Sequence, residues 1–166
     1  GAPADLFASA DERHMSALIG QGLVEAPVLF ARNSLTLITP LDNPAQIKAL
    51  SDLPRAQRLV LGGEEVPVGR YARQLLRSAS RLLGEGEPER LLARLASEEP
   101  NAGLVRSKVA LGEADAAFVY ATDALNSERV RVIPIPQALN VSARYPIAVV
   151  KGASAPVEAR RLIAHL

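Results

Sequence analysis

The chain has no cysteine, no tryptophan, few aromatic residues and no long apolar run. Without cysteine it has no disulfide, no thiolate metal site and no cysteine nucleophile. Only three tyrosines and three phenylalanines occur in 166 residues, which is poor material for stacking nucleic-acid bases. The formal net charge of +1 produces no strong field toward polyanions. Apolar runs stay below the roughly 18 residues that span a bilayer. We therefore expect neither a nucleic-acid partner nor a membrane-spanning helix.

Residues typical of catalytic sites are also sparse. The two histidines, His14 and His165, lie in a charged helix start and one residue from the end of the sequence, where solvated side chains are expected. No His, Asp and Glu residues have metal-ligand spacing. Gly62-Gly63 is not followed by the lysine of a phosphate-binding loop. We predict no catalytic residue, no metal site and no cofactor, and so a protein that is not an enzyme.

The sequence begins Gly1-Ala2-Pro3-Ala4-Asp5, without an initiator methionine or the pattern of a signal peptide. This start favours a mature product or a fragment of a longer protein. A hydrophobic content of 48% with 22% charged residues is ordinary for a globular protein, as one domain or as two small lobes.

Short apolar runs alternate with helical patterns, which predicts an α/β fold with mainly parallel strands. The expected strands are 6–8, 35–39, 59–61, 116–120, 130–133 and 146–150. The expected helices are 11–20, 44–50, 68–83, 88–96, one that follows Asn101 and one that starts near Pro156. Asp11 and Asn101 are suitable N-cap residues. Arginines at helical spacing oppose the apolar face of the third helix, and we expect them to form a solvated face: Arg70, Arg73, Arg77 and Arg81.

The most informative strand is Ala116–Val119, which is apolar throughout and leads directly to Tyr120. A run without polar alternation is typical of a strand covered on both faces. Ligands of open α/β sheets bind beyond the carboxyl ends of the strands, which makes the Tyr120 hydroxyl a candidate binding group. The alternative is a tyrosine that only caps the core.

Two helix starts offer backbone N–H groups at similar places. Val68 and Gly69 follow Pro67, and Ala102 and Gly103 follow Asn101. The first amides of a helix have no partner within it and lie at the positive end of its dipole. Together with a phenol hydroxyl, such uncharged donors suit a small oxyanion. Two ordinary capped helices are the alternative interpretation.

Five segments, in the family's order, resemble the molybdate-binding proteins of ABC importers. The first, Gly1–Asp11, is similar to the family signature G-A-P-A-D-[LV]-F-x-S-A-D. The other four are Ala31–Leu35, Val66–Ala72, Leu111–Asp123 and Tyr145–Val150.

The resemblance implies a type II periplasmic-binding-protein fold with two lobes. Lobe II would be residues 34–144. Lobe I would be discontinuous, formed by 1–33 and 145–166, and incomplete, because family members begin with further strands that carry anion-binding serines. The implied function is to capture molybdate or tungstate between the lobes, outside the cytoplasm, in the periplasm or at the cell surface, and to deliver it to the membrane subunits of an ABC importer.

By the same resemblance the anion-binding groups are the Val68 and Ala102 amides and the Tyr120 hydroxyl, with Gly69 and Gly103 beside them. Val68 replaces the family's alanine and adds bulk near the anion, and Gly103 stands where the family has arginine. With lobe I incomplete, we expect this chain alone to bind molybdate weakly or not at all, and to form a homodimer through the open lobe. Two alternatives remain: the ligand-sensing domain of a regulator, and a receptor for another small oxyanion.

Overall fold

The computed structural model describes residues 3–125 and 127–166, which form two compact units. Unit 1 consists of the residues up to Arg32 together with Ala143–Leu166, and unit 2 is Asn33–Ser142. The chain passes from one unit to the other within β2 (Val28–Pro40) and at the start of β7 (Ser142–Val149). Gly1 and Ala2, which open the first family-like segment, lie outside the described residues.

Unit 1 contains β1 (Leu6–Ala8), α1 (Glu12–Gly20) and α7 (Pro156–His165) besides its parts of β2 and β7. β1 pairs with β7 in antiparallel orientation, with Leu6 opposite Val149. As predicted, Asp11 caps α1, where its carboxylate accepts the N–H groups of Arg13 and His14. The small core of this unit is built on Met15, Val24 and Ala148.

Unit 2 is built on a mixed sheet in which β2, β5 (Ala116–Tyr120), β3 (Leu59–Gly62) and β4 (Ser97–Glu99) are successive neighbours. β6 (Val130–Ile133) also pairs with β2. β3 is parallel to β4 and β5, whereas β2 is antiparallel to β5 and β6. The sheet is thus more mixed than the sequence pattern predicts, because an apolar run reports burial on both faces and carries no information about strand direction.

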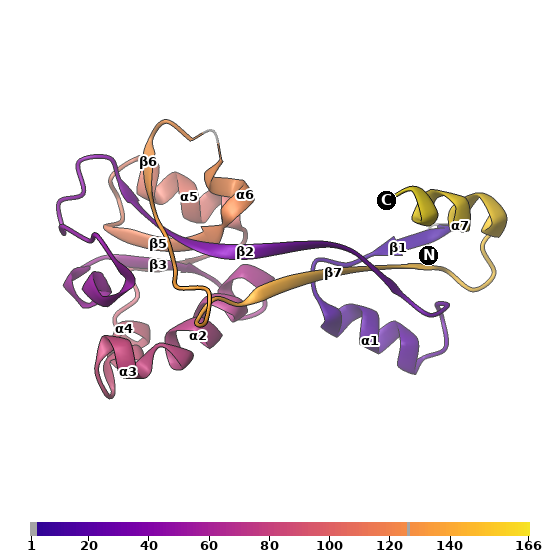
Figure 1. Ribbon diagram of the computed structural model, residues 1–166, viewed down its shortest axis with the longest axis horizontal. Coiled ribbons are helices and arrows are strands. Elements are labelled where there is room, and N and C mark those ends of the chain that lie inside the picture. The colour runs from indigo at the N-terminus through magenta and orange to yellow at the C-terminus, as the bar shows by residue number, and fades with distance from the viewer. Residues whose placement is uncertain (1–2, 126) are drawn as a thin grey trace. The chain divides into compact units, whose positions relative to one another are not determined.

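Helices cover both faces of this sheet (Figure 1). On one face lie α2 (Pro67–Ser78), α3 (Ser80–Leu83), α4 (Glu87–Ala93) and a 3₁₀ helix (Leu50–Arg55). On the other lie α5 (Ala102–Ala110) and α6 (Ala121–Ala124). Successive strand residues alternate between the two cores: Leu59, Leu61 and Phe118 join the first, and Val60 and Val119 join the second.

The helix expected over 44–50 is wrong. Asn43 and Gln46 have positive φ angles of 45° and 53°. The side-chain amide of Asn43 instead organises a loop, donating to the Ile47 carbonyl (2.8 Å) and accepting the Ile47 N–H (3.0 Å). The first regular turns in this region are those of the 3₁₀ helix that starts at Leu50.

Other elements also depart from the sequence pattern. The helix expected over 68–83 is divided at Ala79 into α2 and α3. β2 begins at Val28, seven positions before the predicted strand. The short elements β4 and α6 were not predicted. Within the described residues, no helix is both long and apolar enough to cross a membrane.

Candidate functional site

Three strands of unit 2 end at one edge of its sheet. Because β3 is parallel to both β4 and β5, the ends at Gly62, Glu99 and Tyr120 share this edge. The chain continues from these ends toward α2, α5 and α6 respectively (Figure 1). This is the edge where open α/β sheets bind their ligands.

The start of α2 presents backbone amides at this edge. Val66 is the N-cap residue, and Pro67 occupies the first helical position without an N–H to offer. The bond from the Arg70 N–H to the Val66 carbonyl (3.1 Å) closes the first turn. The amides of Val68 and Gly69 precede that bond, at the positions where helical N–H groups find no partner within the helix.

The side chains at this helix start point into the protein. Val68 is 1% exposed and belongs to the core on the α2 face. A Cβ atom placed on Gly62 would lie 2.8 Å from Val68 Cγ1, so the valine side chain packs against this glycine. Its bulk therefore occupies the core side of the helix start.

Gly69 allows the helix start to touch the end of β3. A Cβ atom at position 69 would lie 2.2 Å from the Gly62 carbonyl oxygen and 2.3 Å from that of Gly63. These distances are far below van der Waals contact, so only glycine fits. The close approach brings the first turn of α2, which carries the Val68 and Gly69 amides, against the strand end.

The start of α5 offers a second pair of amides. As predicted, Asn101 is the N-cap residue, and its Oδ1 atom accepts the Leu104 N–H at 2.9 Å. Ala102 packs against the same core as Val68, whereas Gly103 is exposed. The cap satisfies the third helical amide and leaves those of Ala102 and Gly103 at the helix start.

Tyr120 is the last residue of β5 and lies opposite Leu35 of β2. Tyr120 packs against the core that contains Val68, as Ala102 does, and its hydroxyl oxygen is buried. Val68, Ala102 and Tyr120 therefore belong to or border the same large apolar core, although they come from three separate parts of the sequence.

Polar contacts hold the segment that follows Tyr120. The Asn33 side-chain amide donates to Thr122 Oγ1 at 2.8 Å. The Arg106 guanidinium, from α5, donates to the Asp123 carbonyl at 3.0 Å. These bonds tie α6 to β2 and α5, and so restrict the position of the strand end that carries Tyr120.

Arg73 corrects the expectation of a solvated arginine face. It is 6% exposed and directs its guanidinium at the end of β3. One terminal nitrogen donates to the carbonyls of Gly62 (2.7 Å) and Gly69 (3.1 Å), and the other is paired with Glu98. Helical spacing missed this arginine because its partners lie on β3 and on β4, a strand that the sequence pattern does not reveal.

A second ion pair, between an exposed arginine and a buried aspartate, lies at the opposite edge of the sheet. Arg58 precedes β3, Asp115 precedes β5, and their guanidinium and carboxylate groups are 2.6 Å apart. Burial raises the pKa of Asp115, but hydrogen bonds from the Arg58 side chain and from the N–H groups of Arg58 and Gln57 outweigh it and hold the pKa below its ordinary value. The pair connects the starts of two parallel strands.

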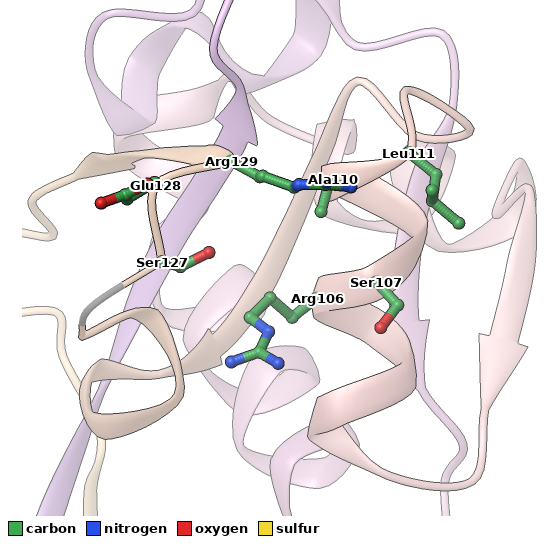
Figure 2. Close-up of a pocket in the computed structure, with 7 residues that line it drawn as sticks. All are labelled: Arg106, Ser107, Ala110, Leu111, Ser127, Glu128 and Arg129. Carbon is green, nitrogen blue, oxygen red and sulfur yellow. The ribbon is translucent and has the colours of Figure 1, made fainter.

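A pocket of about 480 Å³ lies between α5 and the segment that leads to β6 (Figure 2). Its lining residues are Arg106, Ser107, Ala110, Leu111, Ser127, Glu128 and Arg129. The five residues predicted to bind an anion are not among them. In the described part of the chain, no group of three or more His, Asp and Glu side chains is placed to hold a metal ion.

Comparison with known proteins identifies relatives along the whole chain. The family described as "Bacterial extracellular solute-binding protein" matches residues 1–166. The molybdate-binding protein ModA of Mycobacterium tuberculosis is 35% identical over 99% of this chain and 60% of its own length. ModA of Escherichia coli is 30% identical over 92% of this chain and 60% of its own length. The chain thus spans about 60% of the length of these curated relatives.

The fold agrees with these relationships. The structure of the periplasmic molybdate-binding protein of Azotobacter vinelandii has a TM-score of 0.77 and 20% identity, covering 99% of this chain and 72% of that one. The sequence resemblance and the observed α/β architecture therefore indicate the same fold. The chain has the type II periplasmic-binding-protein fold and belongs to the family of bacterial extracellular solute-binding proteins.

Proposed function

We propose that this chain belongs to a receptor that captures molybdate, or tungstate, outside the cytoplasm and delivers it to the membrane subunits of an ABC importer. The observation that carries this proposal is that the starts of α2 and α5 and the end of β5, which hold Val68, Ala102 and Tyr120, follow parallel strands at the same carboxyl edge of the sheet. Unit 2 corresponds to lobe II (34–144) and unit 1 to lobe I (1–33 and 145–166). Relatives named for molybdate binding support the same ligand.

The donors of the site are neutral. The Val68, Gly69, Ala102 and Gly103 amides and the Tyr120 hydroxyl can surround an oxyanion with N–H and O–H groups. The positive ends of two helix dipoles support them. Molybdate and tungstate have equal charge and shape, so this donor set does not separate them. Sulfate has the same charge and is smaller, so cavity size and donor geometry must reject it.

The protein acts by binding and release, without catalysis or a cofactor. Unlike an enzyme, a solute receptor needs no nucleophile, proton carrier or resident metal. A periplasmic or cell-surface location follows from the family and from the role.

We also expect the chain to form a homodimer through unit 1. β1 is the first strand in the sheet order and pairs only with β7, so its other edge is expected to pair with a second copy of the chain. A monomeric mass by light scattering at high concentration would refute such a dimer.

The test is a titration of the ¹⁵N-labelled chain with molybdate, followed by two-dimensional NMR. We expect the amide signals of Val68, Gly69, Ala102 and Gly103 to move together and to saturate, even when affinity is in the millimolar range. Sulfate at equal ionic strength is the control. Equal movement with sulfate would favour a receptor for another oxyanion. Movement of other amides in place of these four would refute the proposed site. Absence of any movement up to tens of millimolar molybdate would mean that these donors do not hold the anion without the serine-bearing strands that family members carry in lobe I.

A ligand-sensing domain of a regulator is the second candidate. It would use the same donors, so the titration does not distinguish it. Reconstituted transport does: the importer role requires that the full-length protein stimulate molybdate uptake by its transporter in vesicles, whereas a sensor domain has no effect.

A further inference from the structure

Arg73 connects the start of α2 with the end of β3. It lies within α2 and is almost completely buried. Its guanidinium contacts the carbonyls of Gly62 and Gly69, the carboxylate of Glu98 and, at 3.6 Å, that of Glu64. A buried arginine is costly unless its donors are satisfied, and here they are directed at backbone and carboxylate oxygens.

One guanidinium nitrogen of Arg73 connects β3 with α2. Gly62 is the last residue of β3, and Gly69 lies in the first turn of α2. The same nitrogen donates to both carbonyls, at 2.7 and 3.1 Å, where Gly69 already touches the strand end. The orientation of the turn that carries the Val68 and Gly69 amides is therefore fixed by side-chain and backbone contacts together.

The other terminal nitrogen of Arg73 extends this connection to β4. Glu98 lies in β4, opposite Leu61 of β3. The Gly63 N–H donates to the Glu99 carbonyl at 2.9 Å, immediately before the chain enters Pro100 and the N-cap Asn101. The guanidinium thus connects the strand that leads to α2 with the strand that leads to α5.

We propose that Arg73 is a positioning residue for the anion site, oriented by Glu98. It holds the Val68 and Gly69 amides in a fixed relation to those of Ala102 and Gly103 without touching the anion. Its positive charge is compensated by Glu98, so the anion meets neutral donors. This inference rests on the proposed function, because only a ligand bound by both helix starts needs their relative position fixed.

The test compares Arg73→Lys and Glu98→Gln with Arg58→Lys. Arg58→Lys perturbs an ion pair of the same chemistry at the opposite edge of the same sheet. Two readouts need no ligand: hydrogen exchange of the Gly63 and Arg70 amides, and the chemical shifts of the four donor amides. A third is the molybdate affinity from the NMR titration. Comparing Tm among the variants separates positioning from general loss of stability.

We expect Arg73→Lys to accelerate exchange at Gly63 and Arg70 at least tenfold more than Arg58→Lys does, at a similar loss of Tm. Molybdate affinity should fall at least tenfold in Arg73→Lys and less in Glu98→Gln, which keeps the arginine. Exchange and shifts equal to those of Arg58→Lys would overturn the inference. A third outcome is that Arg73→Lys accelerates exchange while the wild-type chain does not respond to molybdate. That outcome would support the positioning role and refute molybdate as the ligand of this chain, so failure of the inference and failure of the proposed function are distinguishable.

Discussion

The side-chain amide of Asn140 forms two hydrogen bonds with the backbone of Leu35. Its Nδ2 atom donates to the Leu35 carbonyl at 2.8 Å, and its Oδ1 atom accepts the Leu35 N–H at 3.1 Å. A side chain here takes the place of a neighbouring strand, because it satisfies both backbone groups of one residue. Leu35 lies opposite Tyr120, so this contact steadies the strand beside the proposed anion-binding hydroxyl.

We expect Asn140→Asp to destabilise the protein. The substitution removes the donor to the Leu35 carbonyl and keeps the shape of the side chain. Loss of a partly buried hydrogen-bond partner costs about 1–3 kcal/mol. Urea unfolding followed by circular dichroism measures the change. Gln137→Glu, an exposed position in the same segment with the same charge change, is the control and should stay within about 0.5 kcal/mol of wild type.

Replacement of Tyr120 by phenylalanine should weaken molybdate binding and leave the fold intact. A hydrogen bond to a charged ligand contributes about 1.5–3 kcal/mol, which corresponds to a loss of about ten- to a hundred-fold in affinity. The ring itself stays packed against the core. The NMR titration measures the affinity. An unchanged dissociation constant would show that the hydroxyl does not contact the anion.

Gly69→Ala should be strongly destabilising. The added methyl group would lie 2.2 Å from the Gly62 carbonyl oxygen, and the contact involves backbone on both sides, so α2 must move away from β3. Overpacking of this kind costs about 1–3 kcal/mol or more. Gly20→Ala is the matched control, because a methyl group added at that position would meet nothing within 4 Å. Equal melting temperatures for the two variants would contradict the close approach at Gly69.

The Asp115–Arg58 pair predicts a dependence of stability on pH. The pKa of Asp115 is lowered in the folded protein, so its ionised form stabilises the fold above the ordinary carboxyl pKa. That contribution is lost as the pH falls through the lowered folded value. Asp115→Asn should therefore reduce the free energy of unfolding by about 1–2 kcal/mol at pH 7, since Arg58 is partly exposed and screened.

The difference in free energy of unfolding between Asp115→Asn and wild type should become smaller at acid pH, because the wild-type carboxylate is then protonated and loses its charge. Urea unfolding at pH 7, 4 and 3 measures it. A constant difference across this range would mean that the carboxylate charge contributes nothing and that only the shape of the side chain matters.

Features with a local signal could be predicted from the sequence. Asp11 and Asn101 precede helices and cap them as expected. β5 is an uninterrupted apolar run that ends at Tyr120, and the structure places it accordingly. The five proposed anion-binding residues remain a prediction, since sequence resemblance assigned them and the structure shows only that Val68, Ala102 and Tyr120 belong to or border the same apolar core.

Features that depend on distant partners could not be predicted. β4 consists of Ser97, Glu98 and Glu99, and this polar triplet forms a strand only because β3 offers its free edge. Arg73 looked like a surface residue because its oxygen partners are supplied by the end of β3 and by β4. The sequence around Asn140 does not predict its two hydrogen bonds, because their partner Leu35 lies 105 positions away and comes beside it only in the folded chain.

The contact between Leu35 and Asn140 also bears on how the chain acquires its structure during synthesis. Unit 2 is one continuous segment, whereas unit 1 needs β1 and β7, whose paired residues Leu6 and Val149 are far apart in the sequence. Closing so long a loop is entropically unfavourable, and a folded unit 2 shortens it by joining positions 35 and 140. During synthesis, unit 2 can therefore fold before β7, the partner strand of β1, has been made. Unit 1 is then the last to assemble.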